Sequence, residues 1–146
     1  RKPVGGDRDQ LHAVASGLCD IAIANSYYYG GMIASDDETN KETTDKVSIF
    51  WASQNAEGTH VNVSGVGLLR YAKNPEKAIQ LMEFLASEAS QEWYAEANQE
   101  FPVREGTELS DILEAWGAFK ADPLPISALG ENNANAVRLM NRAGWR

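Results

Sequence analysis

Three consecutive tyrosines, Tyr27, Tyr28 and Tyr29, follow a short apolar run and two small polar residues. Asn25 and Ser26 are both favourable N-cap residues, so we expect a short helix to begin near Tyr27. Successive helical residues lie about 100° apart around the axis, so the phenols of Tyr27 and Tyr28 can face one point in front of the helix. The expected geometry allows two phenol oxygens to bind one cation.

Two neighbouring phenols suit a hard cation of high charge. A tyrosine has a pKa near ~10, but a coordinated hard cation favours the phenolate and displaces the proton. Fe(III) fits this chemistry, because it prefers oxygen ligands and is bound by tyrosine in some haem proteins. The start of a helix adds partial positive charge and free N–H groups, which favour phenolates and any small anion that completes the shell.

The tyrosines also have two simpler interpretations. An aromatic triplet after a strand often packs into a core, and it can form a ring wall against an organic ligand. Residue chemistry leaves these alternatives open beside the metal site.

The segment from Asp20 to Tyr28 resembles the motif that carries adjacent tyrosine ligands in the periplasmic ferric-iron-binding proteins of bacterial ABC importers. The double tyrosine is specific to ferric carriers, whereas other matching segments are shared more loosely with related solute-binding proteins. Those segments follow the family in order and spacing, so the resemblance covers nearly the whole chain: Val61–Leu69, Asn74–Ala78, Phe84–Ser87, Gln99–Val103 and Arg138–Trp145.

The resemblance implies an α/β fold that is part of a two-lobed periplasmic-binding-protein architecture (type II, Venus flytrap), of which this chain is the C-terminal portion only. It implies that Tyr27 and Tyr28 are phenolate ligands of Fe(III), and that Asn25 hydrogen-bonds a synergistic anion such as carbonate or phosphate. Tyr29 would lie behind the ligands. The remaining ligands would come from a missing N-terminal portion of the same protein.

The resemblance also implies a division of the chain into three parts. Residues 1–60 would end the C-terminal lobe and carry the metal-binding tyrosines, residues 61–124 would cross over and contribute helices to the N-terminal lobe, and residues 125–146 would return as a C-terminal helix. The implied function is to bind Fe(III) in the interlobe cleft and deliver it to an ABC permease in the inner membrane. The protein would be periplasmic, or lipid-anchored outside the inner membrane. The alternative is a solute-binding protein of this fold for an organic or anionic small molecule.

Composition narrows the class of protein. The 146 residues are 43% hydrophobic and 23% charged, which is ordinary for a soluble globular chain. No apolar run approaches the ~18 residues of a membrane-spanning helix. The net charge of −8 argues against a nucleic-acid partner.

Cys19 is the only cysteine, so we expect a packed thiol or a partner cysteine outside this chain. Because the chain opens on Arg1 without an apolar leader, we expect the natural protein to begin earlier.

Hydrophobic periodicity and turn residues predict the elements that position the tyrosines. We expect Asp7 to cap the first helix, and the apolar sides of the helices between residues 75 and 97 and of the last helix to be buried. Acidic residues 35–45 predict a solvated loop or a ragged helix. Strands are expected before Asn25, at 47–51 and at 60–63, and helices at 7–17, 75–86, 87 or 90 to 97, 109–119, and 127 or 132 to 142.

Catalytic constellations are not evident in the sequence. His12 and His60 are isolated, with His12 expected on a solvated face, and Cys19 has no obvious partner. We therefore expect a binding protein rather than an enzyme.

Overall fold

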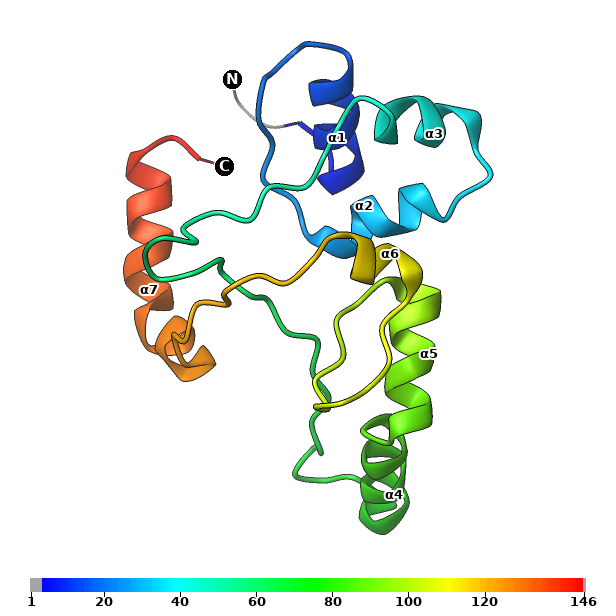
Figure 1. Cartoon of the computed structure of the whole chain (residues 1–146). Helices are drawn as coiled ribbons and strands as arrows, with labels where there is room; N and C mark the ends of the chain where they lie inside the picture. The colour runs from blue at the N-terminus through cyan, green and yellow to red at the C-terminus, as the bar shows by residue number, and fades with distance from the viewer. Residues whose placement is uncertain (1–3, 146) are drawn as a thin grey trace. The chain divides into compact units, whose positions relative to one another are not determined.

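The computed structural model describes residues 4–145, and the described chain is mainly helical (Figure 1). It divides into two compact units. One contains residues 51–61 and 119–145, and the other contains residues 4–50 and 62–118. The helices of the described chain are α1 Asp7–Ala15, α2 Ser26–Ile33, α3 Glu38–Thr44, α4 Pro75–Leu85, α5 Glu88–Asn98, α6 Asp111–Ala115 and α7 Ile126–Arg142.

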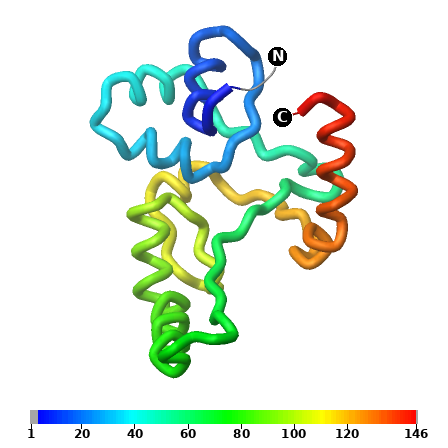
Figure 2. Tube along the Cα trace, turned by 180° about the vertical axis from the view of Figure 1, so that it is seen from behind, coloured from blue at the N-terminus to red at the C-terminus, as the bar shows by residue number. Residues whose placement is uncertain are grey.

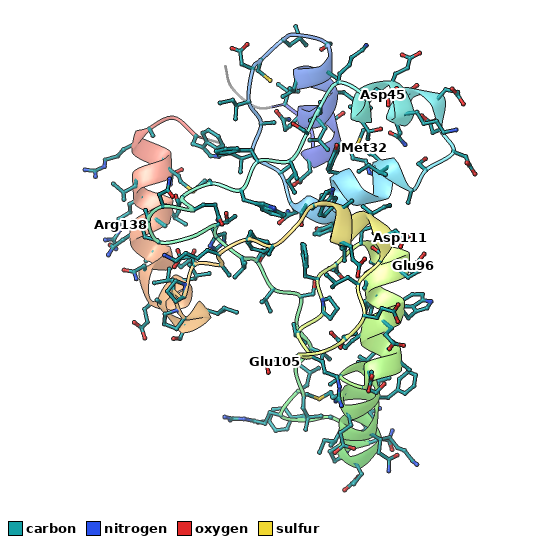
Figure 3. All side chains as sticks on the ribbon, in the orientation of Figure 1. Met32, Asp45, Glu96, Glu105, Asp111 and Arg138 are labelled. Atoms are coloured by element: carbon teal, nitrogen blue, oxygen red, sulfur yellow. The ribbon has the colours of Figure 1, made fainter. Side chains whose placement is uncertain are left out.

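Helix α2 is central to the larger unit, where it contacts α1, α3, α5 and α6. Figure 2 shows α1, α2 and α3 grouped at one end of this unit and α4 at the other. Met32 on α2 is fully buried beside α1 (Figure 3), and Leu11, Ala95 and Leu113 complete the buried apolar set. The core of this unit is therefore built around the helix that carries the tyrosines.

Gly30 allows α2 to pack closely against the end of α5. A Cβ at this position would lie 2.5 Å from Cβ of Gln99 and 3.1 Å from the Trp116 ring. Gln99 adopts a left-handed conformation (φ 56°) and ends α5. Ser110 donates to Gln99 Oε1 at 2.6 Å and its Oγ accepts from the Leu113 amide, which fixes α6 beside the same contact.

Several helix boundaries agree with their sequence signals. Helix α4 begins at Pro75 after Asn74, and Ser87 caps α5 by accepting from the Ser90 amide. The acidic segment forms α3, with Asp37 accepting from the Asn40 amide. The helix expected at 109–119 is shorter, because Ser110 starts it and the chain turns at Gly117 (φ 72°).

The first helix corrects two predictions. Gly6, rather than Asp7, is the N-cap of α1, and the Gly6 amide donates to the Asp9 carboxylate at 2.7 Å. His12, expected to be solvated, has Nδ1 at 2.7 Å from Oγ1 of the buried Thr43. This hydrogen bond joins α1 to α3.

The predicted strands and the α/β class are not confirmed by the described residues. Ile21, Ile23 and Phe50 lie in segments without regular secondary structure and are 82%, 90% and 86% exposed. An extended segment becomes a strand only where another backbone accepts and donates its hydrogen bonds. Between residues 4 and 145 the structure contains one isolated parallel bridge, Thr59 to Ala121, and no strand.

Apolar faces predicted to be buried are also largely open. Phe84 on α4 is 63% exposed, Trp93 on α5 is exposed, and α7 has no buried residue. The helices themselves form where the periodicity places them. The prediction that their apolar sides are buried was wrong, because other described residues do not cover them.

The smaller unit is held together by backbone and side-chain contacts between its two segments. Gln54 Nε2 donates to the Lys120 carbonyl at 3.0 Å, and the Lys120 amide donates to Gln54 Oε1 at 2.7 Å. The rings of Trp51 and Phe119 stack with centroids 4.2 Å apart.

The three-part division of the chain stays a prediction. In the described part of the chain, no helix has the length and apolar character needed to cross a bilayer.

Candidate metal centre

Tyr27 and Tyr28 lie on the first turn of α2, where the sequence places them. Helix α2 begins at Ser26 and its N-cap is the extended Asn25 (φ −71°, ψ 136°). The two phenol rings have centroids 4.4 Å apart and planes inclined by 36°. Both side chains are partly exposed. The structure therefore brings together the two phenols that were assigned as metal ligands.

The surroundings of Tyr27 raise its pKa to about 12, chiefly through a hydrogen bond with the Tyr28 side chain. Desolvation and the negative charges of Asp7 and Glu100 act in the same direction. Each effect disfavours a second negative charge at this place. Tyr27 consequently keeps its proton in the absence of a cation, while the negative charges of Asp7 and Glu100 favour a cation at this place.

Tyr29 has a different environment from the other two tyrosines. Its hydroxyl donates to the Val47 carbonyl at 2.7 Å, and its ring stacks on Trp116 with centroids 5.8 Å apart. Burial raises the pKa of its phenol. Tyr29 is a packing residue that anchors α2 to the α6 region and to the segment after α3.

Asn25 is held by hydrogen bonds on both sides of its amide. Its backbone N–H and its Nδ2 both donate to Oδ1 of Asp7, at 2.7 Å and 3.2 Å. Its Oδ1 accepts from Nδ2 of Asn62 at 3.3 Å. The side chain makes no capping bond to α2. Asn25 thus ties the start of α2 to the start of α1 and to the segment after residue 61.

Two acidic residues near the phenols were missed by sequence reasoning as parts of the site. Asp7 and Glu100 lie close enough to act on Tyr27, and Glu100 accepts from Ser64 at 2.9 Å. The guanidinium carbon of Arg8 lies 6.0 Å from the centroid of the Tyr28 ring. The sequence offers no local signal for Glu100, which lies 72 positions after Tyr28 and reaches the site only through the fold.

The donor set at this place consists of phenols. Among residues 4–145, no group of three or more histidine, cysteine, aspartate and glutamate side chains is arranged to hold a metal ion. A hard trivalent cation matches two phenolate oxygens in acidic surroundings. The arrangement can supply two adjacent anionic ligands and leaves the rest of a coordination shell open.

This chain is similar in sequence to proteins that are named for iron uptake and ferric iron binding. It is 45% identical over 148 residues to iron uptake protein A2 of Synechocystis sp., covering 100% of this chain and 43% of that protein. The major ferric iron-binding protein of Neisseria meningitidis serogroup B is 25% identical over 145 residues, covering 99% and 42%. The chain therefore spans less than half the length of these relatives.

Solved structures of similar proteins identify the fold. A Trichodesmium protein in complex with iron and citrate is 42% identical, with a TM-score of 0.94 over 100% of this chain and 46% of that one. The ferric binding protein from Campylobacter jejuni is 36% identical, with a TM-score of 0.95 over 100% and 46%. The chain thus has the fold of the corresponding part of ferric-binding proteins.

The sequence profile described as bacterial extracellular solute-binding protein matches residues 7–121. This match covers the helix with the tyrosine pair, Asn25, Asp7 and the other charged residues around the phenols. The chain belongs to the bacterial extracellular solute-binding protein family.

Proposed function

We propose that this chain supplies one wall of a ferric-iron site in a periplasmic iron carrier, with Tyr27 and Tyr28 as phenolate ligands. The observation that carries the proposal is the closeness of the two phenol rings, 4.4 Å between centroids, at the partly exposed start of α2. The relatives named for iron uptake and ferric binding, and the Trichodesmium structure with iron and citrate, support the same cargo.

The chemistry of capture is an exchange of protons for a metal ion. The Tyr27 phenol, with its pKa raised to about 12, stays protonated until a cation offsets the negative charge of two phenolates. Fe(III) binding to the pair then releases both phenol protons. Reduction to the softer, less charged Fe(II), or protonation of the phenolates, would favour release. No covalent bond of a substrate is broken, so the protein works as a carrier and not as an enzyme.

The remaining iron ligands belong, in this proposal, to a second lobe outside this chain. Two phenolates leave most of the ferric coordination shell unfilled, and the named relatives are more than twice as long as this chain. Large apolar side chains that the described residues leave open, including Ile23, Phe50 and Phe84, support a partner segment that covers them. Hinge closure of two lobes would complete the shell around the metal.

Asn25 holds an anionic group beside the phenolates in this proposal. Its backbone N–H and Nδ2 face a common acceptor, and it directly precedes the helix that carries both ligands. A negative group at this position suits the start of α2, where the helix dipole and unpaired amides favour anions. Carbonate or phosphate would take this place only by displacing Asp7, whose Oδ1 is the acceptor in the structure.

Delivery to an ABC permease in the inner membrane follows from the family and the cargo. Extracellular solute-binding proteins present their ligand outside the cytoplasmic membrane, and the similar curated proteins are named for iron uptake. The proposed location is therefore the periplasm, either in solution or through a lipid anchor.

The test uses the full-length polypeptide that contains this chain. Adding ferric citrate should produce a red or purple phenolate-to-iron charge-transfer band, and Tyr27→Phe combined with Tyr28→Phe should abolish it. Tyr71→Phe is the matched control, because Tyr71 is 87% exposed and the substitution removes the same oxygen far from the pair in sequence. A colourless wild-type protein, or a double variant that keeps the band, would refute the ferric site.

An organic or anionic small molecule is the alternative cargo. The observation that favours it is the guanidinium of Arg8 beside the partly exposed Tyr28 ring, which together offer a positive charge and a flat apolar surface. Calorimetry with metal-free citrate separates the two functions. Citrate binding that survives the double phenylalanine variant and needs no iron would support this alternative.

A further inference from the structure

The carboxylate of Asp7 already occupies the donors at the start of α2. Its Oδ1 lies 2.7 Å from the Asn25 backbone nitrogen and 3.2 Å from Asn25 Nδ2. The side-chain oxygen of Asn25, Oδ1, accepts from Nδ2 of Asn62 at 3.3 Å. An external oxyanion that used the Asn25 donors would have to displace Asp7.

The position of Asp7 also opposes a second anion on electrostatic grounds. An oxyanion held by Asn25 would lie within a few ångströms of the Asp7 carboxylate, and like charges at this distance repel. Glu100, close enough to act on Tyr27, adds to the negative potential. Arg8 contributes a positive charge near the Tyr28 ring. A single cation suits this set of charges better than an additional anion.

The local structure explains how the carboxylate reaches this place. Gly6 takes the N-cap position of α1 and its amide is satisfied by Asp9, so Asp7 is not used for capping. Asp7 is instead directed across to Asn25, eighteen positions later. In the first turn of α1, the Asp9 carboxylate therefore bonds to its own helix, whereas the Asp7 carboxylate bonds to the start of α2.

We propose that Asp7 is a built-in anion of the iron site, whose carboxylate takes the place of a synergistic oxyanion at Asn25. The inference rests on the proposed ferric function and specifies it further. The protein would bind Fe(III) with no carbonate or phosphate at this position, and loss of the Asp7 charge would open a place for such an anion.

The first experiment measures oxyanion binding to the iron-free, full-length protein. Inorganic phosphate is followed by ³¹P NMR and ¹³C-labelled bicarbonate by ¹³C NMR in wild type, Asp7→Ala and Asp7→Asn. The wild-type protein should show no saturable binding at millimolar concentrations. Each Asp7 variant should bind at least one of the two anions at least tenfold more tightly, and the two titrations show which oxyanion is preferred.

The second experiment follows the ferric charge-transfer band in buffer freed of carbonate and phosphate. Adding either anion should leave the band and the apparent affinity of wild type unchanged within about twofold. In Asp7→Ala the same addition should shift the band and strengthen iron retention against citrate by at least tenfold. A wild-type band that requires or responds to the anion would overturn the proposal.

Asp9→Asn is the matched control, since Asp9 is an acidic residue in the same first turn but bonds to Gly6 and not to Asn25. It should behave as wild type toward both anions.

Asp7→Asn keeps an oxygen that can accept from the Asn25 amide while removing the charge, so it should fold even if Asp7→Ala does not. If both Asp7 variants unfold while Asp9→Asn folds, or if they fold and gain no anion binding, the carboxylate is a structural contact and the proposal is wrong. A wild-type protein that binds no iron would refute the ferric function, while the phosphate and bicarbonate titrations would still decide the role of Asp7.

Discussion

The phenol rings of Tyr27 and Tyr28 lie against each other at the start of α2 and form one pair rather than two independent side chains. Their ring centroids lie 4.4 Å apart, and the contact with Tyr28 is the largest cause of the raised Tyr27 pKa. A cation that binds both oxygens would offset the repulsion between two phenolates. The pair should therefore respond to substitution as a unit, so that loss of either oxygen removes most of the ferric affinity.

The titration of Tyr27 should depend on Tyr28. Because the hydrogen bond favours the protonated phenol, Tyr28→Phe should lower the Tyr27 pKa from about 12 toward the ordinary value of 10.0. Ultraviolet titration of phenolate absorption in the iron-free protein measures this change, with Tyr71→Phe as the control. A raised pKa also means that the stabilising effect of the contact is present below about pH 10 and is lost as pH rises toward 12. An unchanged high-pH titration in Tyr28→Phe would contradict the pairing.

Ferric affinity should rise with pH, because phenols that bind the metal give up their protons. Each phenol that loses its proton on binding weakens the apparent affinity about tenfold for every unit that the pH falls. Between pH 6 and pH 8, competition with a chelator whose own protonation is corrected should therefore give a slope of at least about two protons per iron. Tyr28→Phe should reduce this slope by about one proton per iron. A pH-independent affinity would show that phenols do not carry the metal.

Gly30 should be far less tolerant of substitution than its neighbour Gly31. Gly30→Ala places a Cβ 2.5 Å from Cβ of Gln99, so α2 or the end of α5 must shift, at a cost of about 1–3 kcal/mol in the free energy of unfolding. At Gly31 the nearest atom to a new Cβ is Nη2 of Arg8 at 3.7 Å, so Gly31→Ala should stabilise the helix by up to about 1 kcal/mol. Urea unfolding of the two full-length variants checks the contrast. Equal effects would mean that the close approach of α2 to α5 is absent in solution.

Sequence patterns were sufficient for features that depend on neighbouring residues. Asn74 followed by Pro75 set the start of α4, Ser87 set the start of α5, and Asn25 preceded α2 as expected. These signals act over three or four positions, because a capping side chain such as that of Ser87 accepts from an amide in the first turn of its own helix. The closeness of Tyr27 and Tyr28 on one helical turn is a local property of the same kind.

Features that depend on distant residues could not be predicted in this way. Glu100 reaches the phenols, and Asn62 reaches Asn25, only because the fold brings separate segments together. The strand expected before Asn25 does not form in the described chain, since period-two or apolar patterns do not identify the neighbour that completes a ladder. The apolar side chains of Ile21 and Ile23 are exposed, because no other part of residues 4–145 packs against them.

The 146-residue chain prepared by itself should expose apolar surface that the full-length polypeptide covers. Ile23, Phe50 and Phe84 are among many large apolar side chains left open, and such patches bind the dye ANS or drive association. We expect strong ANS fluorescence or oligomers from the isolated chain, and weak fluorescence from the full-length protein. An isolated chain that is monomeric and does not bind ANS would argue against a covering lobe.

Arg8 should strengthen iron binding through its charge. Its guanidinium carbon lies 6.0 Å from the Tyr28 ring centroid, and a positive charge at that distance stabilises a phenolate by on the order of 1 kcal/mol in partly solvated surroundings. Arg8→Gln should therefore lower ferric affinity by about threefold to tenfold, measured by citrate competition at low ionic strength. The loss should shrink with added salt, since screening weakens interactions between exposed charges. Arg104→Gln, in the exposed loop between α5 and α6 that also contains Glu105 (Figure 3), is the matched control and should leave the affinity unchanged. If Arg8→Gln instead tightens iron binding, Arg8 competes with the metal for the phenolate oxygens and its proposed contribution has the wrong sign.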